Sequence, residues 1–336
     1  MVDRRVSMAD VAERAGVSGQ TVSRVVNGSP RVDPDTRARV EAAMAELGYR
    51  PHRAARALRT GRTQTLGLVV STLASIGNSR MLQAVADAAA ARGYALTVVT
   101  LGPDGGVADA FERLAEQGVD GAIVLNEATA RVRGADVRAA GLRLVVVDSP
   151  RDDRLGSEQQ YGIVETDHAA GADSAVRHLL GLGHRTVHHL AGPVGSFAAA
   201  ERERGWRAAL DAAGAPVPDL VRGDWASASG WGAASTLLTA GATAVFAAND
   251  QMALGLLRGI AEAGRAVPGD VSVVGFDDVA DAADYRPPLT TVHQDFDALG
   301  ARAVAVLVDG IEAGAPAAFE TVPTRLVVRE STGPVR

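Results

Sequence analysis

The sequence predicts an α/β protein in which a small N-terminal helical domain precedes two doubly wound lobes. Two observations carry this prediction. Residues 1–50 show apolar side chains at helical spacing, whereas from Thr65 onwards short apolar runs alternate with helical segments, which is typical of parallel strands joined by crossover helices. The alternation restarts near Tyr161, so the larger part of the 336-residue chain divides into two similar units.

Two short helices joined by a turn are predicted between Met8 and Asn27. Ser7 is placed to cap the first helix, and Gly16 ends it. Ser18 is placed to cap the second helix, whose valines fall on one side and leave four residues exposed: Gly19, Gln20, Ser23 and Arg24. A helix fits the major groove of B-DNA, where Gln pairs with adenine and Arg with guanine. Any short helix pair with a glycine turn has this pattern, so DNA binding and a purely structural role both stay open at this point.

A third helix and the distribution of charge favour DNA binding. Asp33 is placed as the N-cap of this helix, Pro34 at its first position and Gly48 past its end, and the buried stripe is expected to be Val40, Met44 and Leu47. Arg outnumbers Asp and Glu in residues 1–62, whereas the whole chain has a formal net charge of −6. The positive potential is therefore expected on the three-helix domain, where phosphate would bind.

The rest of the chain is expected to alternate between strands and helices. The expected strands are LGLVVS, YALTVVTLG, VDGAIVLN and LRLVVVDSP in the first unit, and GIVETD, TVHHLAG, ATAVFAAND and VSVVGFDD in the second. The expected helices span residues 79–92, 107–117, 128–140, 169–182, 197–213 and 252–263. Ligands of such sheets bind beyond the carboxyl ends of the strands, so we expect a ligand site in a cleft between the two units.

Polar residues follow several of these strands directly, and they are Ser71, Asn126, Asp148, Asn249 and Asp277. Carboxylates and amides form hydrogen bonds in fixed directions and therefore match the hydroxyls of a sugar. The apolar face of a sugar ring needs an aromatic partner, for which Trp225 and Phe296 are the candidates. Structural interpretations also stay open, because Asn249 and Asp277 could cap the turns that follow them and Trp225 could serve lobe packing.

The chain also contains a set of longer motifs in a fixed order. These are ADVAERAGVSGQTVSRVVNG, VEAAMAELGYRPHRAARALRTGRT, AGPVGSFAAAERERGW, GDWASASG, ANDQMALG, VSVVGFDD and PPLTTVHQDF. Together they resemble the LacI family of transcriptional repressors, and the resemblance covers nearly the whole chain.

The resemblance implies a domain layout. A helix-turn-helix DNA-binding domain would span 1–50, a hinge helix or linker 51–62, and a sugar-binding regulatory domain of the periplasmic-binding-protein-like type I fold 63–336. The two lobes of that last domain would be composed as follows: lobe 1 of 63–161 and 291–320, and lobe 2 of 162–290 and 321–336.

The resemblance also assigns residues to two sites. The DNA-contacting set would be Ser18, Gly19, Gln20, Thr21, Ser23, Arg24, Asn27, His52, Arg53, Ala55 and Leu58. Leu58 would wedge into the minor groove from the hinge helix, although a flexible tether is the alternative for this segment. Arg202, Asn249 and Asp277 would hold the hydroxyls of a sugar ring, unless Arg202 pairs with a neighbouring Glu on a solvated helix face. The same pocket would be lined by Ser71, Asn126, Asp148, Trp225, Gln294 and Phe296.

The implied function is repression of carbohydrate-utilisation genes through a pseudo-palindromic operator in double-stranded DNA. A sugar inducer, either a galactoside or another glycoside, would release the protein from its operator. No leucine heptads that could form a tetramerisation helix follow the last strand, so we expect a homodimer and not a tetramer. A regulator of the same architecture with a purine-like corepressor or another non-sugar effector is one alternative, and a sugar-processing enzyme is another.

Some residues depart from the resembled repressors. Gly19 lacks the large side chain expected at the start of the recognition helix, so the operator need not be the same. Ser75 and Gly77 at the mouth of the pocket are less apolar, and Thr166 replaces an aromatic residue. The identity of an aglycone or a second sugar therefore stays open.

Composition and motif content argue against a metal enzyme and a membrane protein. The chain has no Cys, and it contains no HExxH motif, Walker loop or GxSxG elbow. His188 and His189 are adjacent in an expected strand, so they point to opposite faces and are not expected to share a metal ion. We expect no cofactor and no metal. Because no segment approaches about 18 apolar residues, we also expect no membrane association and a cytoplasmic location.

Overall fold

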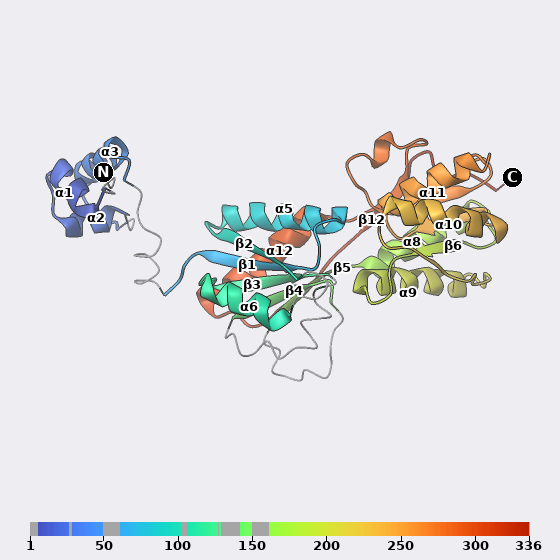
Figure 1. Ribbon diagram of the computed structural model, residues 1–336, viewed down its shortest axis with the longest axis horizontal. Helices are drawn as coiled ribbons and strands as arrows, with labels where there is room; N and C mark the ends of the chain where they lie inside the picture. The colour runs from blue at the N-terminus through green and yellow to red at the C-terminus, as the bar shows by residue number, and fades with distance from the viewer. Residues whose placement is uncertain are drawn as a thin grey trace. The chain divides into compact units, whose positions relative to one another are not determined.

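The computed structural model describes residues 6–26, 29–49, 61–101, 106–126, 128, 142–149 and 161–335. The chain separates into two compact units, Met1–Thr63 and Gln64–Arg336. The first unit is helical, and the second contains two six-stranded sheets (Figure 1). This confirms the predicted fold class of a three-helix domain followed by an α/β domain with two lobes.

The first unit is a three-helix domain made of α1 Met8–Ala15, α2 Gly19–Val26 and α3 Pro34–Glu46. The Ser7 hydroxyl accepts a hydrogen bond from the Asp10 N–H, and the Asp10 carboxylate accepts one from the Ser7 N–H, which completes a capping box. Gly16 ends α1 in the left-handed conformation with φ 65°. The helices enclose a small core of Val11, Ala12, Ala15, Val22, Val25, Val40, Ala43 and Tyr49.

The predicted caps and the predicted buried stripe of this domain agree with the structure. The Ser18 hydroxyl accepts from the Thr21 N–H at 3.1 Å, and the Asp33 carboxylate accepts from the Thr36 N–H at 3.1 Å. In the stripe of α3, Val40 is fully buried, and Met44 and Leu47 pack against the core while partly buried. Local sequence signals were sufficient here because each cap bonds within its own first turn.

The first lobe is built on a parallel sheet with the strand order β11-β5-β4-β3-β1-β2. Its strands are β1 Thr65–Val70, β2 Ala95–Thr100, β3 Gly121–Leu125, β4 Arg143–Val147, β5 Tyr161–Thr166 and β11 Phe319–Val322. The helices α5 Ile76–Ala91 and α12 Phe296–Ala313 cover one face, and α6 Val107–Glu116 covers the other (Figure 1). Burial on both faces explains why the central strands are continuous apolar runs.

The second lobe has the same construction, with the strand order β12-β10-β9-β8-β6-β7. Its strands are β6 His188–Ala191, β7 Val221–Arg222, β8 Ala244–Ala247, β9 Ser272–Asp277, β10 Thr290–His293 and β12 Arg325–Val327. One face packs against α8 His168–Gly181 and α9 Phe197–Ala212, and the other against α10 Ser227–Thr239 and α11 Asp250–Glu262. A 3₁₀ turn spans Ala282–Asp284. β12 is antiparallel to β10, whereas the other pairs are parallel.

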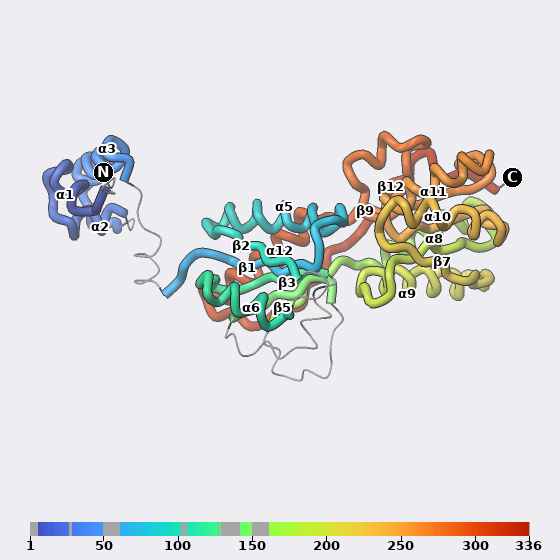
Figure 2. The backbone as a smooth tube through the Cα atoms, in the orientation of Figure 1, coloured from blue at the N-terminus to red at the C-terminus, as the bar shows by residue number. Residues whose placement is uncertain are grey.

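The chain crosses between the lobes later than expected at the first two crossings, whereas the third lies close to its expected position (Figure 2). GIVETD was expected to open the second unit, but β5 pairs with β4 and β11 in the first sheet. The crossings therefore follow Thr166, His293 and Val322. Each strand before a crossing completes its ladder of backbone hydrogen bonds before the chain leaves the sheet. The alternation of strands and helices along the sequence does not reveal which sheet a strand joins.

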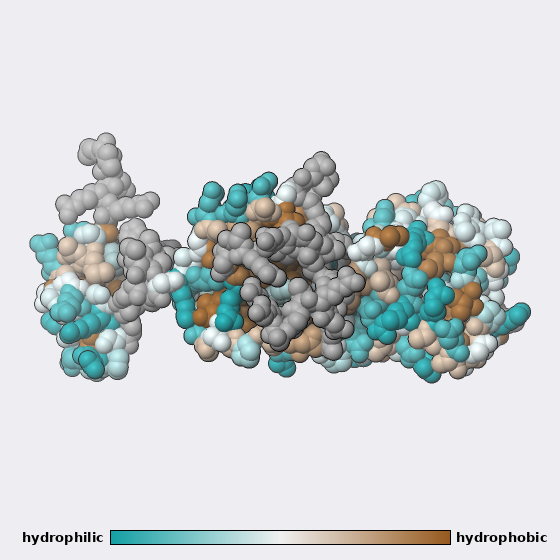
Figure 3. Space-filling view, turned by 90° about the horizontal axis from the view of Figure 1, so that it is seen from below, coloured by the Kyte–Doolittle hydropathy of each residue, from teal (hydrophilic) through white to brown (hydrophobic). Residues whose placement is uncertain are grey.

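Further differences concern helices. Helix α10, in the stretch that follows Trp225, and helix α12 were not among the expected helices. The small residues and serines of α10 give little apolar periodicity. The expected helix at 128–140 lies outside the described residues except for Ala128. None of the helices in the described ranges combines the length and hydrophobicity that a membrane span requires. On the face shown in Figure 3, hydrophilic and hydrophobic residues are interspersed over both lobes.

Candidate functional site

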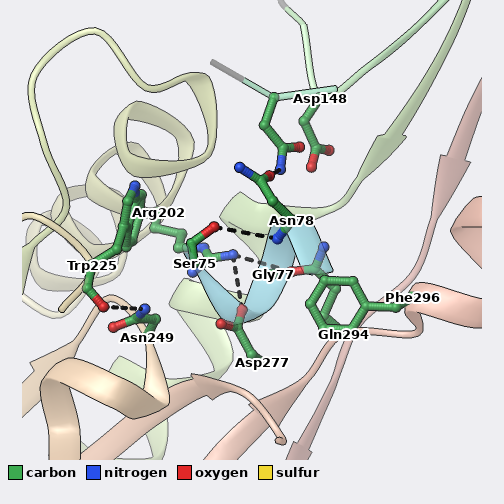
Figure 4. A pocket seen from close by; sticks show the side chains of 11 residues that line it. Ser75, Gly77, Asn78, Asp148, Arg202, Trp225, Asn249, Asp277, Gln294 and Phe296 are labelled. Carbon is green, nitrogen blue, oxygen red and sulfur yellow. Dashed lines mark hydrogen bonds and ion pairs between the residues drawn. The ribbon is translucent and has the colours of Figure 1, made fainter. Parts of the chain in front are cut away.

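A pocket lies where the carboxyl ends of the two sets of strands face each other, with an open volume of about 380 Å³ (Figure 4). The first lobe contributes Ser75, Gly77, Asn78, Asn126, Asp148 and Phe296. The second lobe and the crossing after β10 contribute Arg202, Trp225, Asn249, Asp277 and Gln294.

The structure brings together all but one of the predicted effector-site residues. The exception is Ser71, which follows β1 but is not part of the pocket lining. The first turn of α5 takes that place in the wall, through Ser75, Gly77 and Asn78. Asn78 was missed because the expected helix began at residue 79, and a side chain in the first turn of a helix gives no signal of its own.

Arg202 is the central charge of the pocket. It lies on α9 and is only 4% exposed. Its Nη2 donates to Asp277 Oδ1 at 3.3 Å and to Gln294 Oε1 at 3.1 Å, and its Nη1 donates to the carbonyl of Ala248. The guanidinium also lies over the ring of Phe276, 3.7 Å from the centroid. Contacts with β9 and with the segments after β8 and β10 therefore fix the plane of the guanidinium.

The alternative of an Arg202 that pairs on a solvated helix face does not hold. Of the acidic neighbours on α9, Glu201 pairs with Arg204 and Glu203 pairs with Arg222. Arg202 itself is buried and pairs with Asp277.

Burial shifts the protonation equilibria of the Arg202 and Asp277 pair in opposite directions. Burial raises the pKa of the Asp277 carboxyl to about 6, although the Arg202 guanidinium opposes this rise. Burial lowers the pKa of Arg202, and Asp277 and Asp148 oppose that change. The charge on Asp277 therefore depends on pH in a range close to neutrality.

His168 connects charged groups of the two lobes behind the pocket wall. Arg202 Nε donates to His168 Nδ1 at 3.3 Å, so Nδ1 must carry the lone pair and the proton of the neutral ring lies on Nε2. That nitrogen lies 3.1 Å from Asp148 Oδ1. Asp148 stands on the first lobe directly after β4, whereas His168 begins α8 of the second lobe. Sequence reasoning treated His168 as a structural histidine and gave no signal for this contact.

Backbone strain is concentrated at the pocket. Asn126, Asp148, Trp225 and Asp277 all have positive φ, with values of 45°, 52°, 75° and 113°. Such values are uncommon for any residue other than glycine and are unusual for a bulky one such as Trp. Gly192 accommodates the Trp225 indole, because a side-chain carbon at this glycine would collide with the ring. The fold thus holds the indole at the edge of the pocket although the backbone conformation of Trp225 is unfavourable.

Asn249 caps a helix and also lines the pocket. Its Oδ1 accepts from the Met252 N–H at 2.9 Å and caps α11, as the structural interpretation required. Its Nδ2 donates to the carbonyl of Trp225 at 3.1 Å, and the side chain also lines the pocket. Capping and ligand binding are therefore compatible at this residue.

His189 has structural partners in the core of the second lobe. His189 is fully buried, stacks on Phe246 at 4.7 Å, and shares a hydrogen bond with the carbonyl of the same residue. Burial lowers the pKa of His189 to about 4, so the ring is neutral at pH 7. Among the described residues, no group of three or more His, Cys, Asp or Glu side chains is arranged to hold a metal ion.

Most of the predicted DNA-contacting residues at α2 are exposed, but Ser23, which was expected to be exposed, is partly buried. Ser18, Gly19, Gln20 and Arg24 are exposed, and Thr21 and Ser23 are partly buried on the same helix. The other predicted contacts, Asn27, His52, Arg53, Ala55 and Leu58, lie outside the described residues.

The family comparisons match both units of the chain. The family described as bacterial regulatory proteins, lacI family, matches residues 7–52, and the periplasmic binding protein-like domain matches residues 176–332. The lactose operon repressor of Escherichia coli (strain K12) is 38% identical over 335 residues, which cover 97% of this chain and 91% of the relative. The HTH-type transcriptional regulator CelR of Thermobifida fusca is 38% identical and covers 98% of both chains.

Solved structures give the same result. The lac repressor dimer bound to operator and the anti-inducer ONPF superposes with a TM-score of 0.84 at 36% identity, covering 98% of this chain and all of that one. A complex of the transcriptional regulator CelR with cellobiose superposes with a TM-score of 0.71 at 36% identity, covering 97% of this chain and all of that one.

Proposed function

Because this chain belongs to the lacI family of bacterial regulatory proteins, we propose that it represses transcription and that a sugar bound between its lobes releases it from DNA. The observation that carries the sugar part of this proposal is the buried Arg202, which is held by Asp277 and Gln294 at the pocket. A guanidinium, a carboxylate and amides in fixed positions present the donors and acceptors that ring hydroxyls require. Trp225 supplies an apolar surface beside them, as the flat face of a sugar ring requires.

The DNA part of the proposal rests on α2. Gln20 and Arg24 are exposed on this helix, where they can reach base edges in the major groove of double-stranded DNA. We propose that a homodimer places two such helices on the halves of a pseudo-palindromic operator. The lac repressor, to which this chain is similar, was solved as a dimer bound to its operator.

We propose a galactoside or another glycoside as the effector, and binding rather than chemistry as the role of the pocket. Asp277 accepts a hydrogen bond from Arg202, and Asp148 accepts one from the N–H of Thr166, so both carboxylates serve to orient partners. The relatives are transcriptional regulators rather than enzymes. We propose that the protein acts in the bacterial cytoplasm, where transcription is regulated.

Fluorescence anisotropy tests this function. A labelled duplex, selected by the full-length protein from a randomised library, is titrated with protein and then challenged with galactosides, glucosides and purines. Release by a sugar is the expected outcome. Tighter DNA binding with a purine, or tight binding that no sugar relieves, would contradict the proposed role of the pocket while leaving DNA recognition in place.

Sugar affinity is expected to fall as the pH is lowered through about 6. The Asp277 carboxyl has a pKa of about 6 without ligand, and a hydroxyl that donates to the carboxylate stabilises its ionised form. Binding below this pH must therefore release a proton, and the dissociation constant should rise about tenfold from pH 7.5 to pH 5. Arg202, His168, Asp148 and Asp250 also face this carboxyl and contribute to its field. In Asp277→Asn, calorimetry should show weak sugar binding that lacks this pH dependence. If the sugar affinity of the variant depends on pH as it does in the unmodified protein, Asp277 is not the titrating group.

His168 is expected to act as a positioning residue for Arg202. In His168→Phe, Arg202 Nε loses its acceptor, and sugar affinity should fall about 10- to 100-fold, since a hydrogen bond to a charged group typically contributes about 1.5–3 kcal/mol. In His168→Asn, the side-chain oxygen occupies a place close to that of Nδ1 and should restore most of the affinity. Titration calorimetry compares the two variants, and equal losses in both would indicate a packing role only.

A further inference from the structure

Asp250 is a fully buried carboxyl group outside the lining of the pocket. It stands at the start of α11, directly after Asn249. Its Oδ2 accepts from the Val279 N–H at 2.9 Å, and its Oδ1 accepts from the Thr291 hydroxyl at 2.5 Å. Both partners lie outside α11, and the cap of this helix is Asn249. Asp250 therefore joins the start of α11 to the turn after β9 and to β10, and it is not needed as a helix cap.

The turn after β9 has a conformation that the surrounding structure must impose. Asp277 and Asp278 have φ values of 113° and 55°, which are unfavourable for residues other than glycine. The Val279 N–H, which Asp250 holds, is the first backbone donor after these two residues. The side chain that this turn presents to the pocket is Asp277, which accepts from Arg202 at 3.3 Å (Figure 4). Asp250 is thus placed to fix the direction of Asp277.

The second sheet leaves room for the Asp250 carboxyl. Gly275 in β9 pairs with Thr291 in β10. A side-chain carbon at Gly275 would collide with Asp250 Oδ1, so the carboxyl occupies the space over this glycine, beside the Thr291 hydroxyl. The absence of a side chain at Gly275 therefore allows Asp250 to reach both of its partners.

The segments that Asp250 joins also supply the polar groups around Arg202. The carbonyl of Ala248 accepts from Arg202 Nη1, and Asn249 lines the pocket. Gln294, which accepts from Arg202 Nη2 at 3.1 Å, directly follows β10. One buried carboxyl group thus connects three segments of the pocket wall.

We propose that Asp250 is a positioning residue of the sugar site, which acts through Val279 and Thr291 to hold Asp277 in the direction that meets both Arg202 and a sugar hydroxyl. This inference rests on the proposed function, because it takes Asp277 as a ligand group. Without the contacts of Asp250, the turn would sample other conformations, and ordering it on binding would reduce the affinity for sugar.

Titration calorimetry on the full-length protein tests this inference. Lactose, cellobiose, maltose and methyl β-galactoside are compared first, and the tightest ligand of this panel is used for all variants. Asp250→Ala removes both hydrogen bonds and should weaken sugar binding at least about tenfold. Asp250→Asn keeps an oxygen for the Val279 N–H and places an N–H beside the Thr291 hydroxyl, so it should restore most of the affinity. Equal losses in these two variants would overturn the positioning role.

Two valine variants separate positioning from stability, and they remain informative if Asp250→Ala folds poorly. Thr291→Val removes the hydroxyl that donates to Asp250 at nearly constant volume. Thr290→Val is the matched control: this residue is also fully buried in β10, but its hydroxyl accepts from the Arg329 N–H. Adjacent strand residues point to opposite faces, so Thr291 alone of the two faces Asp250. Both variants should lower the unfolding temperature, but only Thr291→Val should weaken sugar binding, by about 2- to 10-fold. Equal affinities for sugar in the two variants would contradict the proposal.

A double-mutant cycle tests whether the effect passes through Asp277. In an Asp277→Asn background, Thr291→Val should cost little further affinity, because the group that it helps to position is already absent. Additive losses would show that Thr291 acts on the pocket by another route and would overturn the assignment. If the unmodified protein binds none of the four sugars, the proposed function fails; if it binds sugar and changes at Asp250 and Thr291 have no effect, only this inference fails.

Discussion

Replacement of Arg202 by alanine should abolish the response to sugar while DNA binding remains intact. Arg202 supplies the donors at the second-lobe side of the pocket, and its removal leaves the carboxylate of Asp277 buried without its partner. Hydrogen bonds to charged groups typically contribute about 1.5–3 kcal/mol each, so sugar affinity should fall about 100-fold or more. Breaking a buried pair also typically costs about 3–5 kcal/mol of stability, so the α/β domain should unfold at a lower temperature. The three-helix domain has its own core and should keep its affinity for DNA.

Two companion variants separate the loss of a ligand contact from the loss of stability. Arg202→Lys keeps a positive charge opposite Asp277 but removes the planar fork and the Nε contact with His168, so it should fold better and still respond poorly to sugar. Arg204→Ala removes an exposed Arg of the same helix, paired with Glu201, and should change neither property. The three variants are compared by the fluorescence anisotropy of one labelled DNA fragment as the sugar concentration is increased. A normal sugar response in Arg202→Lys and Arg202→Ala would remove Arg202 from the site.

Replacement of Arg24 by alanine should weaken binding to the selected DNA sequence by about 5- to 150-fold, which corresponds to about 1–3 kcal/mol. Arg24 is exposed near the end of α2, on the side opposite the buried Val22 and Val25. An Arg that forms two hydrogen bonds with guanine discriminates between bases. Sequence specificity should therefore be lost at only one base pair of each half-site.

The control for Arg24 removes the same charge from another helix of the domain. Arg39 is exposed on α3, and Arg39→Ala should lower the affinity for selected and random DNA only slightly and to a similar extent. Binding is compared on selected and random duplexes at several salt concentrations. A loss in Arg24→Ala that is equal on both duplexes, with a salt slope reduced by about one, would show that Arg24 contacts phosphate and reads no base.

The sequence was informative where structure depends on neighbouring residues. Examples are the cap of α1 at Ser7, the end of α1 at Gly16 and the end of α3 near Gly48, all of which depend on contacts within one turn. The effector-site residues that follow β3, β4, β8 and β9 were predictable for another reason. Parallel strands place their carboxyl ends at one edge of a sheet, so a polar residue after each apolar run points to that edge.

Contacts between distant segments could not be predicted in the same way. The link from Asp148 through His168 to Arg202 joins three elements of two lobes, and no spacing along the chain encodes it. In the first sheet β5 lies between β4 and β11, and β11 is more than 150 residues away along the chain. The positive φ values at the pocket are likewise imposed by the surrounding fold, because Trp225 has no local preference for such a conformation.

Reciprocity between the two ligands tests the central claim most directly. If sugar weakens DNA binding by a given factor, DNA must weaken sugar binding by the same factor, which for coupled sites is typically about 5- to 150-fold. Sugar affinity is measured by calorimetry on the full-length protein, alone and saturated with its selected duplex, and DNA affinity is measured with and without saturating sugar. The account predicts equal factors that both exceed fivefold. A sugar that binds equally well to the free and the DNA-bound protein would show that the pocket does not control DNA binding.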